Sequence, residues 1–191
     1  MEEIRLHGRG GQGVVMCSEL IALAALHDGK FSRAFPWFGM ARRGAPVTAF
    51  VSLGKKSEFS RSMIYSPKYV MVLDPRLHRV LPTVTKGLRE GGVYIQNTPK
   101  QPKEVLSELR LEARLSKIAT IDATKYAMEF MGRPIPNIVM LGAFAKVTGL
   151  ITLDSAIKAV EERFPQKLWD SYVRCVRVGY ENVSTEVLSN E

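Results

Sequence analysis

A glycine-rich turn near the amino terminus constrains the possible fold of this chain more than any other feature. Residues 4–15 read IRLHGRGGQGVV, so a strand-like alternation precedes Gly8, Gly10, Gly11 and Gly13, and a helical pattern follows. Glycine accepts positive φ angles and lets a ligand or another chain segment approach the backbone. A helix that begins after such a turn presents free N–H groups to an anion. Taken alone, the G-x-G-x-x-G spacing in this context favours a dinucleotide.

Strand and helix patterns alternate along the rest of the chain. Apolar runs such as YVMVLDP and KIATIDAT are separated by segments with helical spacing. This alternation predicts an α/β, Rossmann-like fold, with a mostly parallel sheet and helices on both faces. We expect a single domain over residues 1–183, a mostly irregular loop over residues 31–46, and a polar, loose tail over residues 184–191.

Composition narrows the class of protein. The chain has 191 residues, of which 46% are hydrophobic and 24% are charged, as is common for globular domains. It has no apolar run of the length that spans a membrane and no amino-terminal signal peptide, so we expect a cytoplasmic protein with no membrane partner. The net charge of +8 comes from scattered basic residues. Because no aromatic-interleaved RNA motif accompanies them, we expect no nucleic-acid partner.

The cysteine count argues against a redox centre of the chain's own. Cys17 and Cys175 are the only cysteines, whereas an iron–sulfur cluster needs about four thiolates. No group of His and Cys residues has the spacing of metal ligands. We therefore expect no metal site, no catalytic residue and no cofactor bound by this chain alone.

The glycine motif lacks one part of a dinucleotide site. An NAD site places an acidic residue about 20 residues after the glycines, where it binds the ribose hydroxyls, but no Asp or Glu lies between Asp28 and Glu58. Arg33, Arg42 and Arg43 in that region could instead bind the extra phosphate of NADP, which leaves a stand-alone NADP-binding oxidoreductase open. The glycines could also serve only to pack a helix closely against a strand.

Three segments together resemble a known family. GRGGQGVV at residues 8–15, FPWFGMARRGAPVTAFV at residues 35–51 and IDATKYAMEFMGRPIPNIVMLGAFAKVTGL at residues 121–150 are similar to the gamma subunit of 2-oxoacid:ferredoxin oxidoreductases, the enzymes that include pyruvate synthase. The resemblance implies a Rossmann-like subunit of an enzyme that converts a 2-oxoacid, coenzyme A and oxidised ferredoxin into acyl-CoA, carbon dioxide and reduced ferredoxin. Pyruvate is the leading candidate for the 2-oxoacid.

The resemblance also implies what surrounds the chain. Thiamine diphosphate, Mg²⁺ and [4Fe–4S] clusters would lie on other subunits, and coenzyme A would be a co-substrate. The expected partners are the alpha, beta and delta-type subunits of the same enzyme, with ferredoxin reached through the complex. The residues expected to contact either coenzyme A or a neighbouring subunit are Gly8, Arg9, Gly10, Gly11, Gln12, Gly13, Arg42 and Arg43.

Other segments give more local predictions. An apolar group in the expected loop is predicted to contact another subunit, because aromatic and Met side chains are enriched at interface centres; it consists of Pro36, Trp37, Phe38 and Met40. Asp122 and Asn137 are predicted to cap the helices that follow them. Gly142 is predicted to permit close approach between helices.

Overall fold

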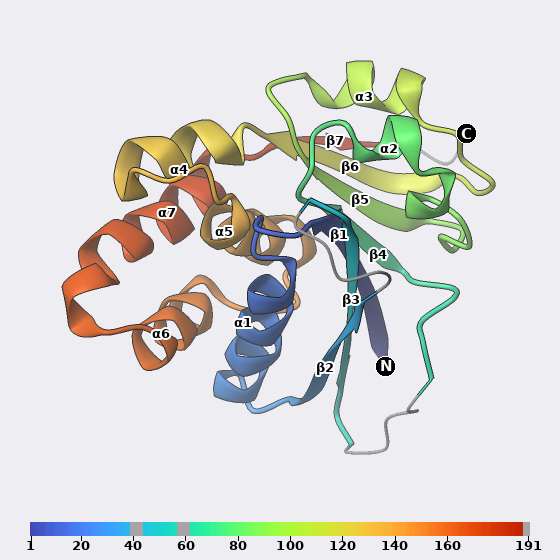
Figure 1. The fold of residues 1–191 in the computed structure, drawn as a ribbon. Coiled ribbons are helices and arrows are strands. Elements are labelled where there is room, and N and C mark those ends of the chain that lie inside the picture. The colour runs from blue at the N-terminus through green and yellow to red at the C-terminus, as the bar shows by residue number, and fades with distance from the viewer. Residues whose placement is uncertain (39–43, 57–61, 189–191) are drawn as a thin grey trace.

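A mixed β-sheet with antiparallel edges forms the centre of the molecule (Figure 1). In the computed structural model, which describes residues 1–38, 44–56 and 62–188, the sheet has seven strands in the order β2-β3-β1-β4-β5-β6-β7. The strands are β1 (Glu2–Arg9), β2 (Phe31–Phe38), β3 (Pro46–Gly54), β4 (Tyr69–Val72), β5 (Gly92–Asn97), β6 (Leu115–Ile121) and β7 (Ser184–Val187). The central strands β1, β4, β5 and β6 are parallel, whereas β2, β3 and β7 pair in antiparallel fashion.

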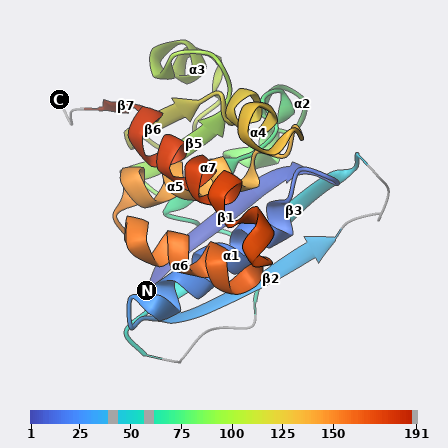
Figure 2. The ribbon, with the colours of Figure 1, turned by 90° about the vertical axis from the view of Figure 1, so that its left-hand side faces the viewer.

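Helices cover both faces of the sheet, as Figures 1 and 2 show. One face carries the larger hydrophobic core, beneath α1 (Val14–His27) and α5 (Asn137–Thr148), with α4 (Ala123–Met131), α6 (Leu153–Arg163) and α7 (Trp169–Asn182) packed around them. The other face carries a smaller core beneath α2 (Leu77–Val80), the 3-10 turn Pro82–Val84 and α3 (Pro102–Glu108). The predicted α/β class with helices on both faces is confirmed.

The first strand buries both of its faces. Ile4 and Leu6 belong to the larger core, whereas Arg5 and His7 point to the opposite face and are also buried. Arg5 Nε donates to His7 Nε2 at 2.9 Å, and Arg5 Nη2 donates to the Lys86 carbonyl at 2.6 Å. Because His7 Nε2 accepts this bond, the ring carries its proton on Nδ1. Burial, together with the Arg5 charge, lowers the pKa of His7 to about 3.

The segment expected to be a loop is partly a strand. Residues 31–38 form β2, which pairs along its length with β3, and the rings of Phe35 and Phe50 lie 5.1 Å apart across the pair. The loop prediction for this part is wrong because cross-strand packing at the sheet edge outweighs the turn tendency of Pro36. An edge strand tolerates proline, since one of its sides lacks a ladder partner.

The expected loose tail is also partly ordered. Residues 184–187 form β7, which pairs with β6 from Thr120 to Lys117. An ion pair between Lys103 of α3 and Glu186 of β7, at 3.4 Å, links the strand to the helix above it. The polar composition of the tail suits an edge strand, whose side chains are mostly exposed. Across the described ranges, no helix is long and apolar enough to span a membrane.

The capping predictions have mixed outcomes. Asp122 caps α4 as predicted, since its side chain accepts from the Lys125 N–H at 3.1 Å. The prediction for Asn137 is wrong, because Pro136 is the N-cap of α5 and Asn137 is its first helical residue. Gly142 does allow close approach: a Cβ there would lie 1.9 Å from the Val176 carbonyl oxygen of α7.

Candidate functional site

The glycine turn joins β1 to α1 and is shaped by contacts of its own. Gly11 and Gly13 have φ angles of 98° and 76°, in the left-handed region that other residues avoid. Gly8 is needed for a different reason, because a Cβ there would lie 2.5 Å from Val14 Cγ2. Close packing of α1 against the sheet therefore accounts for part of the motif, as one of the open alternatives expected.

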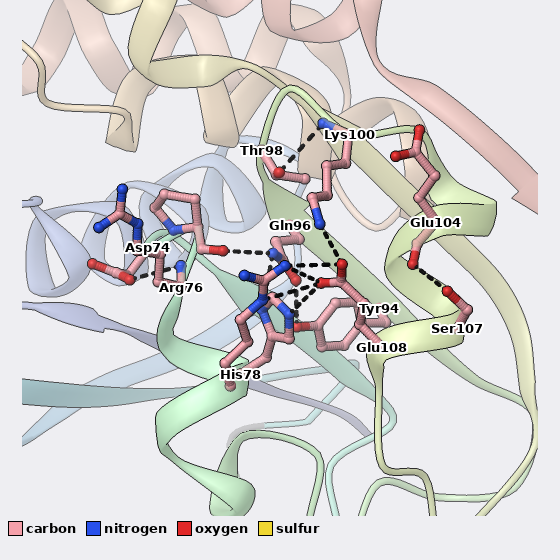
Figure 3. Close-up of polar contacts among 12 residues, drawn as sticks. Asp74, Arg76, His78, Tyr94, Gln96, Thr98, Lys100, Glu104, Ser107 and Glu108 are labelled. Carbon is pink, nitrogen blue, oxygen red and sulfur yellow. Dashed lines mark hydrogen bonds and ion pairs between the residues drawn. The ribbon is translucent and has the colours of Figure 1, made fainter.

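The side chain of Gln12 folds back into the turn. Its Oε1 accepts from the Arg9 N–H at 2.8 Å, and its Nε2 donates to Asp74 Oδ2 at 3.0 Å. The Arg9 Nε donates to the same oxygen at 3.2 Å. Asp74, which follows β4 and is buried, also accepts from the Arg76 N–H at 2.9 Å (Figure 3). Gln12, Arg9 and Asp74 thus form one polar network across the ends of β1 and β4.

This network occupies the place where doubly wound sheets bind nucleotides. The helix after β1 covers one face of the sheet and the helix after β4 covers the other, so the crevice between these strand ends is the topological switch point. Here Gln12 and the Arg9–Asp74 ion pair fill it. In addition, β3 runs antiparallel beside β1, so that Pro46 and Val47 lie next to Arg9 and Gly8. The described strand β3 contains no Asp or Glu, so it does not supply the carboxylate that binds the ribose of a nicotinamide dinucleotide.

A cavity opens on the other side of the turn, at the start of α1. Its volume is about 580 Å³, and we call it the α1 cavity. The first helical bond runs from Cys17 N to Gly13 O at 2.8 Å, which leaves the N–H groups of Val14, Val15 and Met16 without intrahelical acceptors. Gly13 has no side chain with which to cap them, and the first turn carries no acidic residue. The positive end of the helix dipole therefore faces this cavity.

Asn137 adds a buried amide to the same wall. The residue is 6% exposed, lies against Gly13 and lines the α1 cavity. Its Oδ1 accepts from the Ile138 N–H at 2.9 Å, and its carbonyl accepts from Cys17 Sγ at 3.4 Å. Among the hydrogen bonds of the described residues, none uses Asn137 Nδ2. This N–H₂ group is thus available to a ligand oxygen in the cavity.

Basic and aromatic side chains complete the wall of the α1 cavity. Arg9 and Arg133 line it beside the turn, and Arg163 lies farther along. Arg163 is 4.0 Å from Glu19, which is a weak, half-exposed ion pair. Phe164 and Tyr172 stack edge to face, with ring centroids 4.8 Å apart. The cavity therefore combines an end suited to an anion with an apolar aromatic end.

The expected site residues are only partly brought together. The structure places Arg9, Gly10, Gly11 and Gly13 on the α1 cavity, while Gln12 points into the closed crevice. Arg42 and Arg43 lie outside the described residues, as does Met40 of the apolar group. Sequence reasoning missed Asp74, Arg133 and Arg163. The position of Asp74 directly after an apolar strand was the available signal, whereas isolated arginines give none.

A second polar cluster lies on the opposite face of the sheet (Figure 3). Tyr94 OH donates to Gln96 Oε1 at 2.7 Å, and Gln96 Nε2 lies 3.1 Å from His78 Nδ1. Since an amide nitrogen only donates, His78 accepts at Nδ1 and donates from Nε2 to Glu108 Oε2 at 3.1 Å. Hydrogen bonds from Lys100, Arg79 and His78 lower the pKa of Glu108 to about 2. This cluster fastens α2 to the end of α3.

Comparison with known proteins supplies the wider context. Residues 3–182 match the family described as pyruvate ferredoxin/flavodoxin oxidoreductase. The chain is 48% identical over 183 residues to the pyruvate synthase subunit PorC of Methanothermobacter marburgensis, covering 96% of this chain and 98% of that protein. It is 44% identical over 187 residues to the common gamma subunit of pyruvate/ketoisovalerate oxidoreductases of Pyrococcus furiosus, covering 98% of each chain.

Solved structures show the same fold. The crystal structure of the pyruvate oxidoreductase subunit PORC of Thermotoga maritima matches with a TM-score of 0.84 and 39% identity, covering 97% of this chain and 98% of that one. A 2-oxoglutarate:ferredoxin oxidoreductase from Magnetococcus marinus matches with a TM-score of 0.71 and 16% identity, and 93% of this chain corresponds to 30% of that one. The second likeness concerns the fold alone.

Proposed function

Because the chain belongs to the pyruvate ferredoxin/flavodoxin oxidoreductase family, in which its relatives are gamma subunits, we propose that it binds part of coenzyme A for such an enzyme. The enzyme would convert a 2-oxoacid, with pyruvate as the leading candidate, coenzyme A and oxidised ferredoxin into acyl-CoA, carbon dioxide and reduced ferredoxin. The stand-alone NADP-binding alternative has no support from these relatives, and the filled crevice beside β1 argues against it.

The observation that carries this proposal is the start of α1. Uncapped N–H groups of the first turn and the Asn137 amide face a cavity of about 580 Å³. Helix N-termini and arginines are the usual hosts of phosphate groups, and coenzyme A carries a diphosphate and a ribose phosphate. The aromatic end, at Phe164 and Tyr172, suits its apolar or adenine portion.

We also propose that partner subunits hold the catalytic cofactors. Cys17 and Cys175 are both fully buried, and burial raises the pKa of both thiols. In the described part of the chain, no group of three or more His, Cys, Asp or Glu residues could hold a metal ion. Thiamine diphosphate with its Mg²⁺, and the [4Fe–4S] clusters, would therefore be supplied by alpha, beta and delta-type subunits.

A test compares variants in the assembled enzyme. Asn137→Asp keeps the side-chain shape but places a carboxylate against the expected phosphate, and Arg163→Gln removes a cation. We expect each to raise the KM for coenzyme A about tenfold, which corresponds to about 1.4 kcal/mol, with little change in the KM for the 2-oxoacid. Arg43→Ala tests the predicted arginine outside the described residues.

Lys158→Gln is the matched control, because Lys158 is an exposed cation on α6 that does not line the cavity. Its KM for coenzyme A should equal that of the unmodified enzyme. If the cavity variants leave this KM unchanged but release the subunit from the complex, the cavity contacts a neighbouring subunit and the coenzyme A proposal is wrong.

A subunit contact is also proposed at the β2 edge. Trp37 and Phe31 are 53% and 47% exposed on this edge strand, and large exposed aromatic side chains are characteristic of interface centres. We expect Trp37→Ser to weaken assembly, as measured by size-exclusion chromatography of the co-expressed subunits. Tyr65→Ser, which removes another exposed ring, should not. Equal assembly of both variants would refute this contact.

A further inference from the structure

A small polar pocket lies at the carboxyl ends of β5 and β6 and shares no lining residue with the α1 cavity. Its volume is about 240 Å³, and we call it the β6 pocket. Its walls come from the segment after β5, the end of β6, the start of α4 and the junction of α7 with β7. The lining residues used below are Thr98, Lys100, Thr120, Asp122, Lys125 and Tyr126.

Two buried threonines line this pocket. Thr120 is 2% exposed, and no hydrogen bond among the described residues uses its hydroxyl. Thr98 is 4% exposed; its Oγ1 accepts from the Lys100 N–H at 3.3 Å (Figure 3), and its hydroxyl proton has no acceptor within the described ranges. Every fully enclosed side-chain polar atom of the described residues has a hydrogen-bond partner, so the unpartnered Thr120 hydroxyl must reach the surface of the pocket. A ligand oxygen in the pocket would provide the missing acceptor.

Tyr126 supplies a third hydroxyl donor. Its phenol oxygen accepts from Asn182 Nδ2 at 3.1 Å, and a phenol that accepts one bond can still donate its own proton. No hydrogen bond of the described part of the chain takes up that proton. Tyr126 belongs to the first turns of α4, and its ring lies 6.0 Å from Lys125 Nζ.

The charges of the lining favour an anion. Lys100 and Lys125 contribute two ammonium groups, against the single carboxylate of Asp122. That carboxylate already accepts from the Lys125 N–H as the cap of α4. The Lys100 ammonium pairs with Glu108, which lies outside the pocket lining, so Lys125 is the lining cation with no ion-pair partner among the described residues.

We propose that the β6 pocket binds a small oxyanion, either a phosphate ion or the carboxylate group of a small organic acid. The lining offers three hydroxyl groups and the Lys125 ammonium as donors, and an oxyanion presents only acceptors. The volume is below the range of about 300–1,000 Å³ that is typical of drug-sized ligands, and therefore suits a small ion. This site is independent of the coenzyme A proposal, since neither its residues nor its test involve the α1 cavity.

The test uses the full chain labelled with ¹⁵N, titrated with inorganic phosphate in one arm and with acetate in another, at constant ionic strength set with chloride. We expect saturable amide shifts clustered at Thr98, Thr120 and Lys125 in at least one arm, and the tighter arm identifies the source of the oxyanion. Thr120→Val removes the hydroxyl while retaining the shape, and Lys125→Gln removes a rim cation. Each should weaken the affinity about tenfold, the loss expected for one hydrogen bond to a charged group.

Matched controls separate binding from general charge or folding effects. Thr185→Val changes an exposed threonine on β7, and Lys158→Gln removes an exposed cation on α6; both should retain full affinity. Lys125→Gln lies at the pocket rim, so it tests the site even if Thr120→Val impairs folding. The proposal is wrong if shifts do not saturate in either arm, or if the pocket variants bind as tightly as the controls.

Discussion

Replacing Gly13 by alanine tests the physical account of the glycine turn. Gly13 has a φ of 76° and a ψ of 28°, and a left-handed conformation costs a non-glycine residue about 1–2 kcal/mol. A Cβ there would also lie 2.5 Å from Asn137 Nδ2 and 2.9 Å from Asn137 Cβ. Because the Asn137 Cβ is fixed by the backbone of α5, rotation of its side chain cannot relieve this contact. Overpacking of this kind costs about 1–3 kcal/mol.

Gly11→Ala provides the comparison within the same turn. Gly11 has a φ of 98°, but a Cβ there would meet no atom within 4 Å, so this variant should lose only the conformational part, about 1–2 kcal/mol. We therefore expect Gly13→Ala to lower the free energy of unfolding by about 2–5 kcal/mol. Adding Asn137→Ala should recover part of the loss, since it removes the amide but leaves the Cβ.

Urea unfolding of the full chain, followed by circular dichroism, measures these differences. The three variants and the unmodified chain should be compared at one pH, with the m-value checked for constancy. Equal losses for Gly11→Ala and Gly13→Ala would refute the close approach of α1 to α5 as the reason for the second glycine. An absence of any loss for Gly11→Ala would refute the conformational argument.

Three further predictions concern pH dependence and helix packing. The pKa of Glu108 falls from 4.5 to about 2 on folding, so its stabilising effect is present above pH 4.5 and is lost as the pH falls towards 2. Glu108→Gln should make the free energy of unfolding, measured with urea, less dependent on pH in that window. An unchanged pH dependence would contradict the hydrogen bonds to Glu108 as a source of stability. The pKa of His7 falls from 6.5 to about 3, so unfolded chains take up a proton that the native chain does not, and stability should decline as the pH falls from 6.5 towards 3. NMR at pH 5 should still show His7 neutral with its proton on Nδ1, and a charged ring would refute its burial beside Arg5. Gly142→Ala should destabilise the chain by about 1–3 kcal/mol or more, because its Cβ would meet the Val176 carbonyl. Ala143→Gly, which creates no clash, should cost only the change in helix propensity and the loss of one buried methyl group; an equal or larger loss for Ala143→Gly would contradict the close approach at Gly142.

Much of the fold follows from patterns that are local in the sequence. The apolar runs of β4 and β6 and the glycine turn after β1 identify a parallel α/β sheet, because strand and helix periodicities are properties of short segments. Asp122 was predicted correctly as a cap for the same reason, since its side chain bonds to the N–H three residues later. The family resemblance likewise depended on short segments, and the comparisons confirm it.

The local patterns misjudged elements that depend on distant partners. Residues 31–38 contain proline and glycine neighbours typical of a loop, yet they form β2 because β3 is available to pair with them. Residues 184–187 form β7 because β6 has a free edge. A one-dimensional pattern contains no information about which strand edges remain unpaired, so both segments were predicted as irregular.

The sequence by itself determined the class of fold, the position of the glycine turn and the family. The tertiary structure decided which side of that turn can receive a ligand: Gln12 closes one side by bonding to Asp74, 62 residues away, and Asn137 approaches Gly13 on the other. Hydrogen bonds and contacts of this kind depend on side-chain directions and on strand order, which are fixed only when segments distant in sequence pack together.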